Sequence, residues 1–170
     1  MDRRSLQNMM LLIVLILVQV LVCNHIILFN IAIPFIYIYV IIRLPMIMKT
    51  GWVLTWAFFA GLVVDIFSDT PGVNTTACLI IAAIRRPTLF AYIPKDDRTK
   101  DIVPSVANLG LSIYAKYLLT ITLIFCFLVF GIEFGSMFLI KEWMIVSCAS
   151  AAFSFLLMLG IDCLMVKRIE

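Results

Sequence analysis

Long apolar runs are the feature that most constrains this chain. Six such runs are separated by polar or charged residues: 6–23, 26–42, 52–67, 73–84, 111–132 and 143–166. All but run 73–84 approach the roughly 20 residues that a helix needs to cross a bilayer. With 64% hydrophobic and 14% charged residues, the chain cannot hide most of its apolar surface from water. The sequence therefore predicts a protein that folds in lipid.

The length predicts a single all-α membrane domain, residues 1–170, with about six transmembrane helices in one bundle. A chain of 170 residues that crosses the bilayer about six times, with about 20 residues in each crossing, has little left for other domains. Run 73–84 would be only about 18 Å long as a helix. Hydropathy alone therefore does not decide whether this run crosses.

The distribution of positive charge favours six crossings, because short cytoplasmic loops collect Lys and Arg. With six crossings and the N-terminus inside, Lys141 is outside, Lys116 lies within a helix, and the other eleven of the 13 basic residues are cytoplasmic. These eleven are Arg3, Arg4, Arg43, Lys49, Arg85, Arg86, Lys95, Arg98, Lys100, Lys167 and Arg168. If run 73–84 did not cross, the count would be 5 inside against 7 outside. We therefore expect both termini in the cytoplasm.

The polar residues argue against several classes of function. The net charge of +3 follows the loops instead of forming a basic face, which argues against nucleic-acid binding. The five cysteines fall in or beside apolar runs without metal-ligand spacing and are interpreted as small apolar residues. His25 is the one histidine. We therefore predict no catalytic residues, no metal site and no cofactor.

Two charged residues inside predicted helices suggest an ion pair. Lys116 lies about one turn from the cytoplasmic start of run 111–132, and Asp162 lies about one turn from the cytoplasmic end of run 143–166. A buried charge in a bilayer costs at least about 2.5 kcal/mol, so each residue needs a partner or a route to water. We predict that Lys116 and Asp162 pair. The alternative is that each side chain reaches the interface separately.

Asp65 lies on a stripe of small residues, Ala57 and Gly61, at spacing i, i+4, i+8. Such a stripe allows another helix backbone to approach closely. The stripe predicts a helix seam, at which Asp65 either hydrogen-bonds the amides of the following turn or binds a partner or ligand. A second seam is predicted from Ser147, Ser150, Ala151 and Ser154.

The residues after Asp65 predict a tight turn between two helices. Ser68 or Asp69 is expected to cap the next helix, Pro71 suits a first helical turn, and Gly72 permits chain reversal. Together, Gly61, Asp65, Ser68, Pro71 and Gly72 resemble the Gly-x-x-x-Asp-x-x-Ser-x-x-Pro-x-Gly stretch of the MreD rod-shape-determining family. Here Gly72 follows Pro71 directly, and polar residues 74–76 replace a more apolar pattern of that family.

The resemblance extends to chain length, the basic loop after residue 84 and Glu133 after the fifth run. It implies a non-enzymatic scaffold or regulator of the cell-wall elongation complex in the bacterial inner membrane, which maintains cell shape. The implied partners are MreC, a RodA-type glycosyltransferase with a class B penicillin-binding protein, and the MreB filament. The family is also similar in fold to the substrate-binding subunits of energy-coupling-factor vitamin transporters. A small-molecule transporter subunit is therefore the alternative function, and a membrane enzyme is a third, weaker one.

Overall fold

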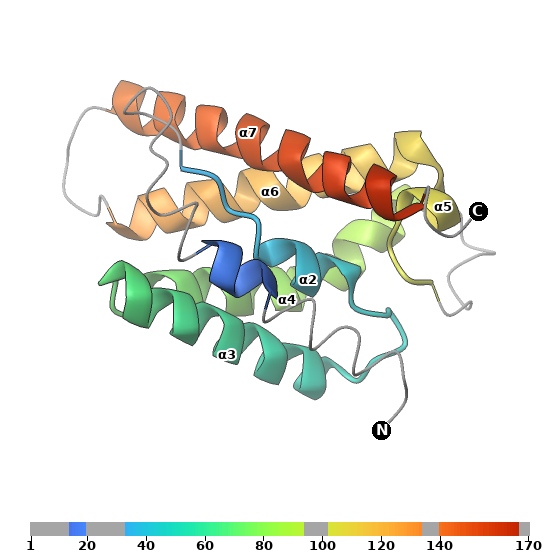
Figure 1. Cartoon of the computed structure of the whole chain (residues 1–170), viewed down its shortest axis with the longest axis horizontal. Coiled ribbons are helices and arrows are strands. Elements are labelled where there is room, and N and C mark those ends of the chain that lie inside the picture. The colour runs from blue at the N-terminus through green and yellow to red at the C-terminus, as the bar shows by residue number, and fades with distance from the viewer. Residues whose placement is uncertain (1–13, 20–32, 94–101, 134–139, 167–170) are drawn as a thin grey trace.

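The computed structural model describes residues 14–19, 33–93, 102–133 and 140–166. Every regular element in these ranges is a helix. A short helical segment at residues 14–18 precedes α2 (Ile38–Arg43), α3 (Thr50–Ser68), α4 (Val73–Tyr92), α5 (Val106–Leu109), α6 (Leu111–Glu133) and α7 (Ile140–Val166). The predicted all-α class is thus confirmed for the described part of the chain (Figure 1).

Three helices of the described ranges are long and apolar enough to cross a membrane. They are Thr50–Ser68, Leu111–Glu133 and Trp143–Leu164. Their bounds confirm the helices predicted from runs 52–67, 111–132 and 143–166. These three helices indicate a membrane protein.

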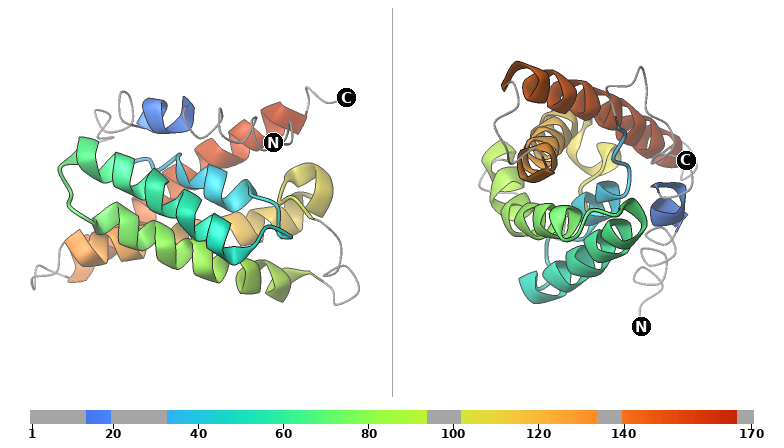
Figure 2. Two further views of the ribbon diagram at one scale, coloured as in Figure 1. Left: turned by 90° about the horizontal axis from the view of Figure 1, so that it is seen from below. Right: turned by 90° about the vertical axis from the view of Figure 1, so that its left-hand side faces the viewer.

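The four long helices surround a buried central chain. α3 packs on α4, α4 packs on α6, and α6 packs on α7. The end-on view in Figure 2 shows residues 33–43 passing between these helices. Every residue from Phe35 to Ile42 is buried, and none of them is more than 7% exposed.

The second apolar run is not the continuous helix that we predicted for 26–42. Residues 33–36 are non-helical, and α2 has six residues, or about 9 Å of helix. An apolar run indicates that a segment is removed from water, and this segment is buried inside the protein instead of facing lipid. Non-helical backbone is tolerated at such a place when protein groups satisfy its hydrogen bonds. Residues 26–32, and the first predicted run apart from residues 14–19, lie outside the described residues.

The fourth run is longer than its apolar residues indicated. α4 continues past residue 84 through Arg85, Arg86 and Pro87 to Tyr92, giving 20 residues, or about 30 Å. The prediction stopped at residue 84 because two arginines follow. The helix continues because Arg85 is buried against backbone carbonyls, as described below.

Candidate functional site

Asp65 joins the last turns of α3 to the first turn of α4. Its Oδ1 accepts hydrogen bonds from the backbone N–H of Asn74 (2.9 Å) and the hydroxyl of Thr70 (3.1 Å). Its Oδ2 accepts from the backbone N–H (2.8 Å) and the hydroxyl (2.6 Å) of Thr75. The first N–H groups of a helix lack partners within the helix and attract negative charge. Asp65 therefore caps α4 from the neighbouring helix. It was predicted to bind amides of the following turn, and the amides that it binds belong instead to the first turn of α4.

Gly61 lies where the backbones of α3 and α4 touch. A Cβ atom at this position would lie 2.5 Å from the Cα of Thr75 and 2.9 Å from the carbonyl oxygen of Asn74. Ala57, Gly61 and Asp65 are all buried. The predicted small-residue seam is confirmed, and its partner is α4.

The turn itself differs from its prediction in two details. Ser68 ends α3, and Asp69 follows in a left-handed conformation with φ 55°. Gly72 precedes α4 with φ 83° and no side-chain cap, so neither Ser68 nor Asp69 caps this helix. Pro71 lies before the first helical turn instead of inside it. The predicted caps are wrong because Asp65, from within α3, already accepts from the amides of α4. The positive φ of Gly72 confirms its role in chain reversal.

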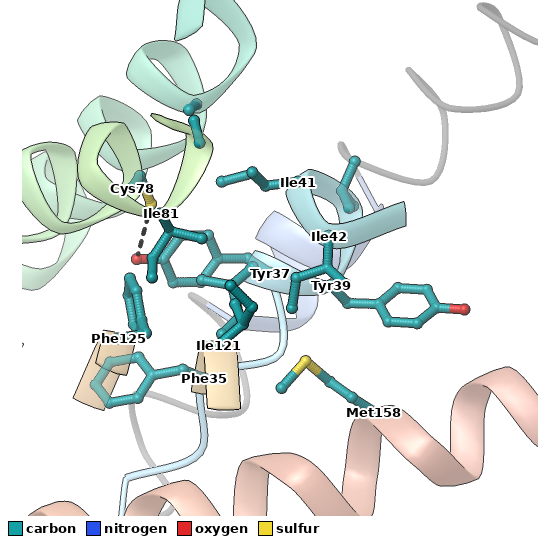
Figure 3. Close-up of a cluster of buried hydrophobic side chains, with 14 of the residues drawn as sticks. Phe35, Tyr37, Tyr39, Ile41, Ile42, Cys78, Ile81, Ile121, Phe125 and Met158 are labelled. Atoms are coloured by element: carbon teal, nitrogen blue, oxygen red, sulfur yellow. Dashed lines mark hydrogen bonds between the residues drawn. The ribbon is translucent and has the colours of Figure 1, made fainter. Parts of the chain in front are cut away.

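Asn74 connects this junction to the central chain. Its Nδ2 donates to the Thr70 hydroxyl (3.1 Å), and its Oδ1 accepts from the Tyr37 hydroxyl (2.9 Å). Tyr37 lies among Cys78, Ile81 and Phe125, with its ring edge-on to Phe125 (Figure 3). The Cys78 thiol donates to the Tyr37 hydroxyl at 3.6 Å. Tyr37 and Tyr39 point in opposite directions (Figure 3), so the two ends of the bundle each receive one tyrosine hydroxyl.

Two serines of α7 hold the non-helical chain. The backbone N–H of Ile33 donates to Ser150 Oγ (3.1 Å), and that of Phe35 donates to Ser154 Oγ (2.8 Å). Ser147, Ser150, Ala151 and Ser154 are all buried. All four residues of the second predicted seam are therefore buried, and two of them, Ser150 and Ser154, bind a non-helical chain.

Gln19 makes two further hydrogen bonds to the backbone of this non-helical chain. Its Nε2 donates to the carbonyl oxygen of Pro34, and its Oε1 accepts from the N–H of Ile36, both at 2.9 Å. Gln19 is fully buried. The amide side chain thus replaces the bonds that a helix would have made. In the sequence, Pro34, which has no N–H, is the residue that indicates a break in the helix here.

Asp162 joins three elements at the other end of the bundle. It is fully buried. Its Oδ1 accepts from the Tyr39 hydroxyl (2.6 Å) and lies 3.3 Å from Arg43 Nη1. Its Oδ2 accepts from the backbone N–H of Val106 (2.7 Å). The predicted pair with Lys116 is wrong, because α2 brings Arg43 to Asp162 while the Lys116 side chain is exposed.

Arg85 is a buried residue that the sequence analysis assigned to a cytoplasmic loop. It is 3% exposed, and its guanidinium donates to the carbonyl oxygens of Ile41 (3.1 Å), Leu44 (2.7 Å) and Pro45 (3.1 Å). These carbonyl oxygens lie at and just beyond the C-terminal end of α2, where carbonyl groups lack N–H donors within the helix. The helical period indicates this burial, because Arg85 lies seven residues after Cys78 and therefore on the same buried stripe of the helix.

A cavity of about 310 Å³ lies beside the α3–α4 turn. Its apolar lining includes Phe35, Val64 and Phe67, and its polar lining consists of Ser68, Thr70, Asn74 and Glu133. The predicted residues Ser68 and Glu133 therefore meet here, next to the Asp65 junction. Lys116 and Asp162 line no part of this cavity.

The described residues contain no group of three or more His, Cys, Asp or Glu side chains that could hold a metal ion. Cys78 and Cys126 are buried and free, whereas Cys148 and Cys163 are exposed and free. Cys23 and His25 lie outside the described residues.

These contacts divide the polar residues into an Asp65 junction at one end of the bundle and an Asp162 cluster at the other. Comparison of the chain with known protein families, with curated proteins and with solved structures finds no match.

Proposed function

We propose that this chain is a non-enzymatic membrane scaffold of the bacterial cell-wall elongation complex, of the MreD type. The proposal is supported by the structural role of the residues on which the family resemblance is based. Gly61, Asp65 and Gly72 build the contact between α3 and α4. All four hydrogen bonds of Asp65 stay within that junction. A motif that shapes two helices suits a protein that acts through its surfaces.

Six crossings with both termini in the cytoplasm belong to this proposal. α4 supports it, because its 20 residues are about as long as the hydrocarbon core is thick, about 30 Å. α4 also packs between α3 and α6. Thr50, at the start of α3, and Arg86 line one hollow, so the basic residues of α4 lie away from the turn at residues 69–72. This arrangement fits the positive-inside rule.

The outer face of α3 is a surface on which to test partner binding. Trp52, Phe59, Leu62 and Ile66 are exposed and follow one another at spacings of seven, three and four residues, which are typical of helix contacts. They lie on the side of α3 away from Gly61, which contacts α4. Partner helices would pack on faces of this kind.

The experiment combines depletion with capture. Depletion of the protein should change cell width before it changes uptake of any nutrient, and tagged protein should capture MreC and the synthase. Replacing Phe59 and Ile66 with alanine should reduce capture at unchanged membrane abundance. Replacing Leu156 and Leu164, which are equally exposed on α7, is the matched control. Normal cell dimensions together with no enrichment of either partner would refute the scaffold.

The substrate-binding subunit of a vitamin-type transporter is the second candidate. The cavity of about 310 Å³ favours it, because small-molecule sites begin at about this size. Capture of a transporter ATPase instead of MreC, or transporter genes beside this one, would favour this candidate.

A further inference from the structure

The cavity beside the α3–α4 turn carries a charge that no described residue neutralises. Among the described residues of its lining, Glu133 is the one that carries an acidic or basic side chain. The ion pair found among the described residues is that of Arg43 with Asp162, which belongs to the opposite end of the bundle. The carboxylate of Asp65 lies directly behind Thr70 and Asn74. The cavity is therefore lined and backed by acidic groups, and the described residues of its lining include no Lys, Arg or His.

Two neutral polar side chains of the lining, Thr70 and Asn74, are held in place by hydrogen bonds. Thr70 donates to Asp65 and accepts from Asn74. The Asn74 amide also accepts from Tyr37. These groups fix the wall of the cavity and leave the Glu133 carboxylate as the group that can engage a charged ligand directly.

The size of the cavity and the apolar residues in its lining make a bare metal ion a poor fit. A volume of about 310 Å³ corresponds to about ten water molecules. Ca²⁺ and Mg²⁺ need about six oxygen ligands, whereas the described lining offers one carboxylate, two hydroxyls and one amide beside its apolar side chains. The lining includes the aromatic residues Phe35 and Phe67, and aromatic rings attract ammonium groups as well as apolar groups.

We propose that this cavity binds a small organic ammonium ion, with the ammonium group at Glu133 and an apolar body against Phe35 and Phe67. The ammonium group comes either from a free amine or from the ethanolamine headgroup of a lipid. The inference goes beyond the scaffold function and does not require transport. It is tested on purified protein, so its failure is separate from a failure of the cell-shape experiment.

The experiment measures thermal unfolding of the full chain in a non-ionic detergent. Phenethylammonium should raise the unfolding temperature, and 2-phenylethanol, its neutral counterpart, should raise it less. Micelles doped with phosphatidylethanolamine, compared with phosphatidylglycerol, test the lipid source. Glu133→Gln should weaken the apparent affinity for the effective ammonium probe at least tenfold. Asp69→Asn is the matched control, because it removes an exposed carboxylate outside the cavity lining and keeps a residue type suited to a left-handed backbone.

Two results would overturn the proposal. Equal stabilisation by phenethylammonium and 2-phenylethanol, with no effect of phosphatidylethanolamine, means that the cavity recognises no ammonium group. Undiminished binding by folded Glu133→Gln means that the carboxylate is not the recognition group. If Glu133→Gln does not fold, the comparison of charged and neutral probes on the native chain still decides.

Discussion

Gly61→Ala adds one methyl group where α3 and α4 touch backbone to backbone. The new Cβ would lie 2.5 Å from the Cα of Thr75 and 2.8 Å from its nitrogen, whereas carbon atoms normally touch at about 3.5–4.0 Å. The helices must therefore separate by about 1 Å at this point. Overpacking of this kind costs about 1–3 kcal/mol. The same movement lengthens the two hydrogen bonds that Thr75 donates to Asp65, which are 2.6 and 2.8 Å long.

Cys78 reports on this junction, because it lies one turn along α4 from Thr75 and is fully buried. The assay uses a variant in which Cys78 is the single cysteine and follows its reaction with a maleimide in detergent. When opening is fast and reversible, the reaction rate follows the opening equilibrium. A loss of about 1–3 kcal/mol then predicts a roughly 5- to 140-fold faster reaction, at about tenfold for each 1.4 kcal/mol.

Gly51→Ala is the matched control on the same helix. A Cβ atom at Gly51 meets nothing within 4 Å, and alanine is better than glycine in a helix by about 1 kcal/mol. This variant should react no faster than its parent. The reasoning fails if Gly61→Ala reacts as slowly as Gly51→Ala at equal yield of folded protein, because α3 and α4 would then not be in backbone contact.

The remaining predictions concern the two buried polar clusters. Asp162→Asn should lower the unfolding temperature because Arg43 loses its ion-pair partner, and Arg43→Gln should lower it for the same reason. The double variant should lose less stability than the two single variants lose together. Strict additivity of the two losses would contradict the ion pair. Lys116→Gln, at an exposed position, should have little effect on the same measurement. Ser154→Ala should cost about 1–3 kcal/mol, because it leaves a buried backbone N–H without an acceptor. Ser147→Ala is its control, since the buried Ser147 hydroxyl has no hydrogen-bond partner among the described residues; equal losses in the two serine variants would show that the bond contributes nothing.

The predicted helices at 52–67, 111–132 and 143–166 follow from apolar length, because a long apolar run in lipid satisfies its backbone most simply as a helix. The Ala57, Gly61 and Asp65 seam follows from the helical period, which brings residues four apart onto one face. Both are local properties of the chain, so the sequence alone was sufficient for them.

Tertiary structure decided which groups meet. Apolar composition cannot distinguish burial in lipid from burial in protein, so the non-helical chain at residues 33–36 was missed. Its N–H groups find acceptors on Ser150 and Ser154, more than 100 residues away. Asp162 pairs with Arg43 instead of Lys116 for the same reason. Spacing along the sequence determines the face of a helix, whereas the partner of a buried charge depends on which helix packs against that face.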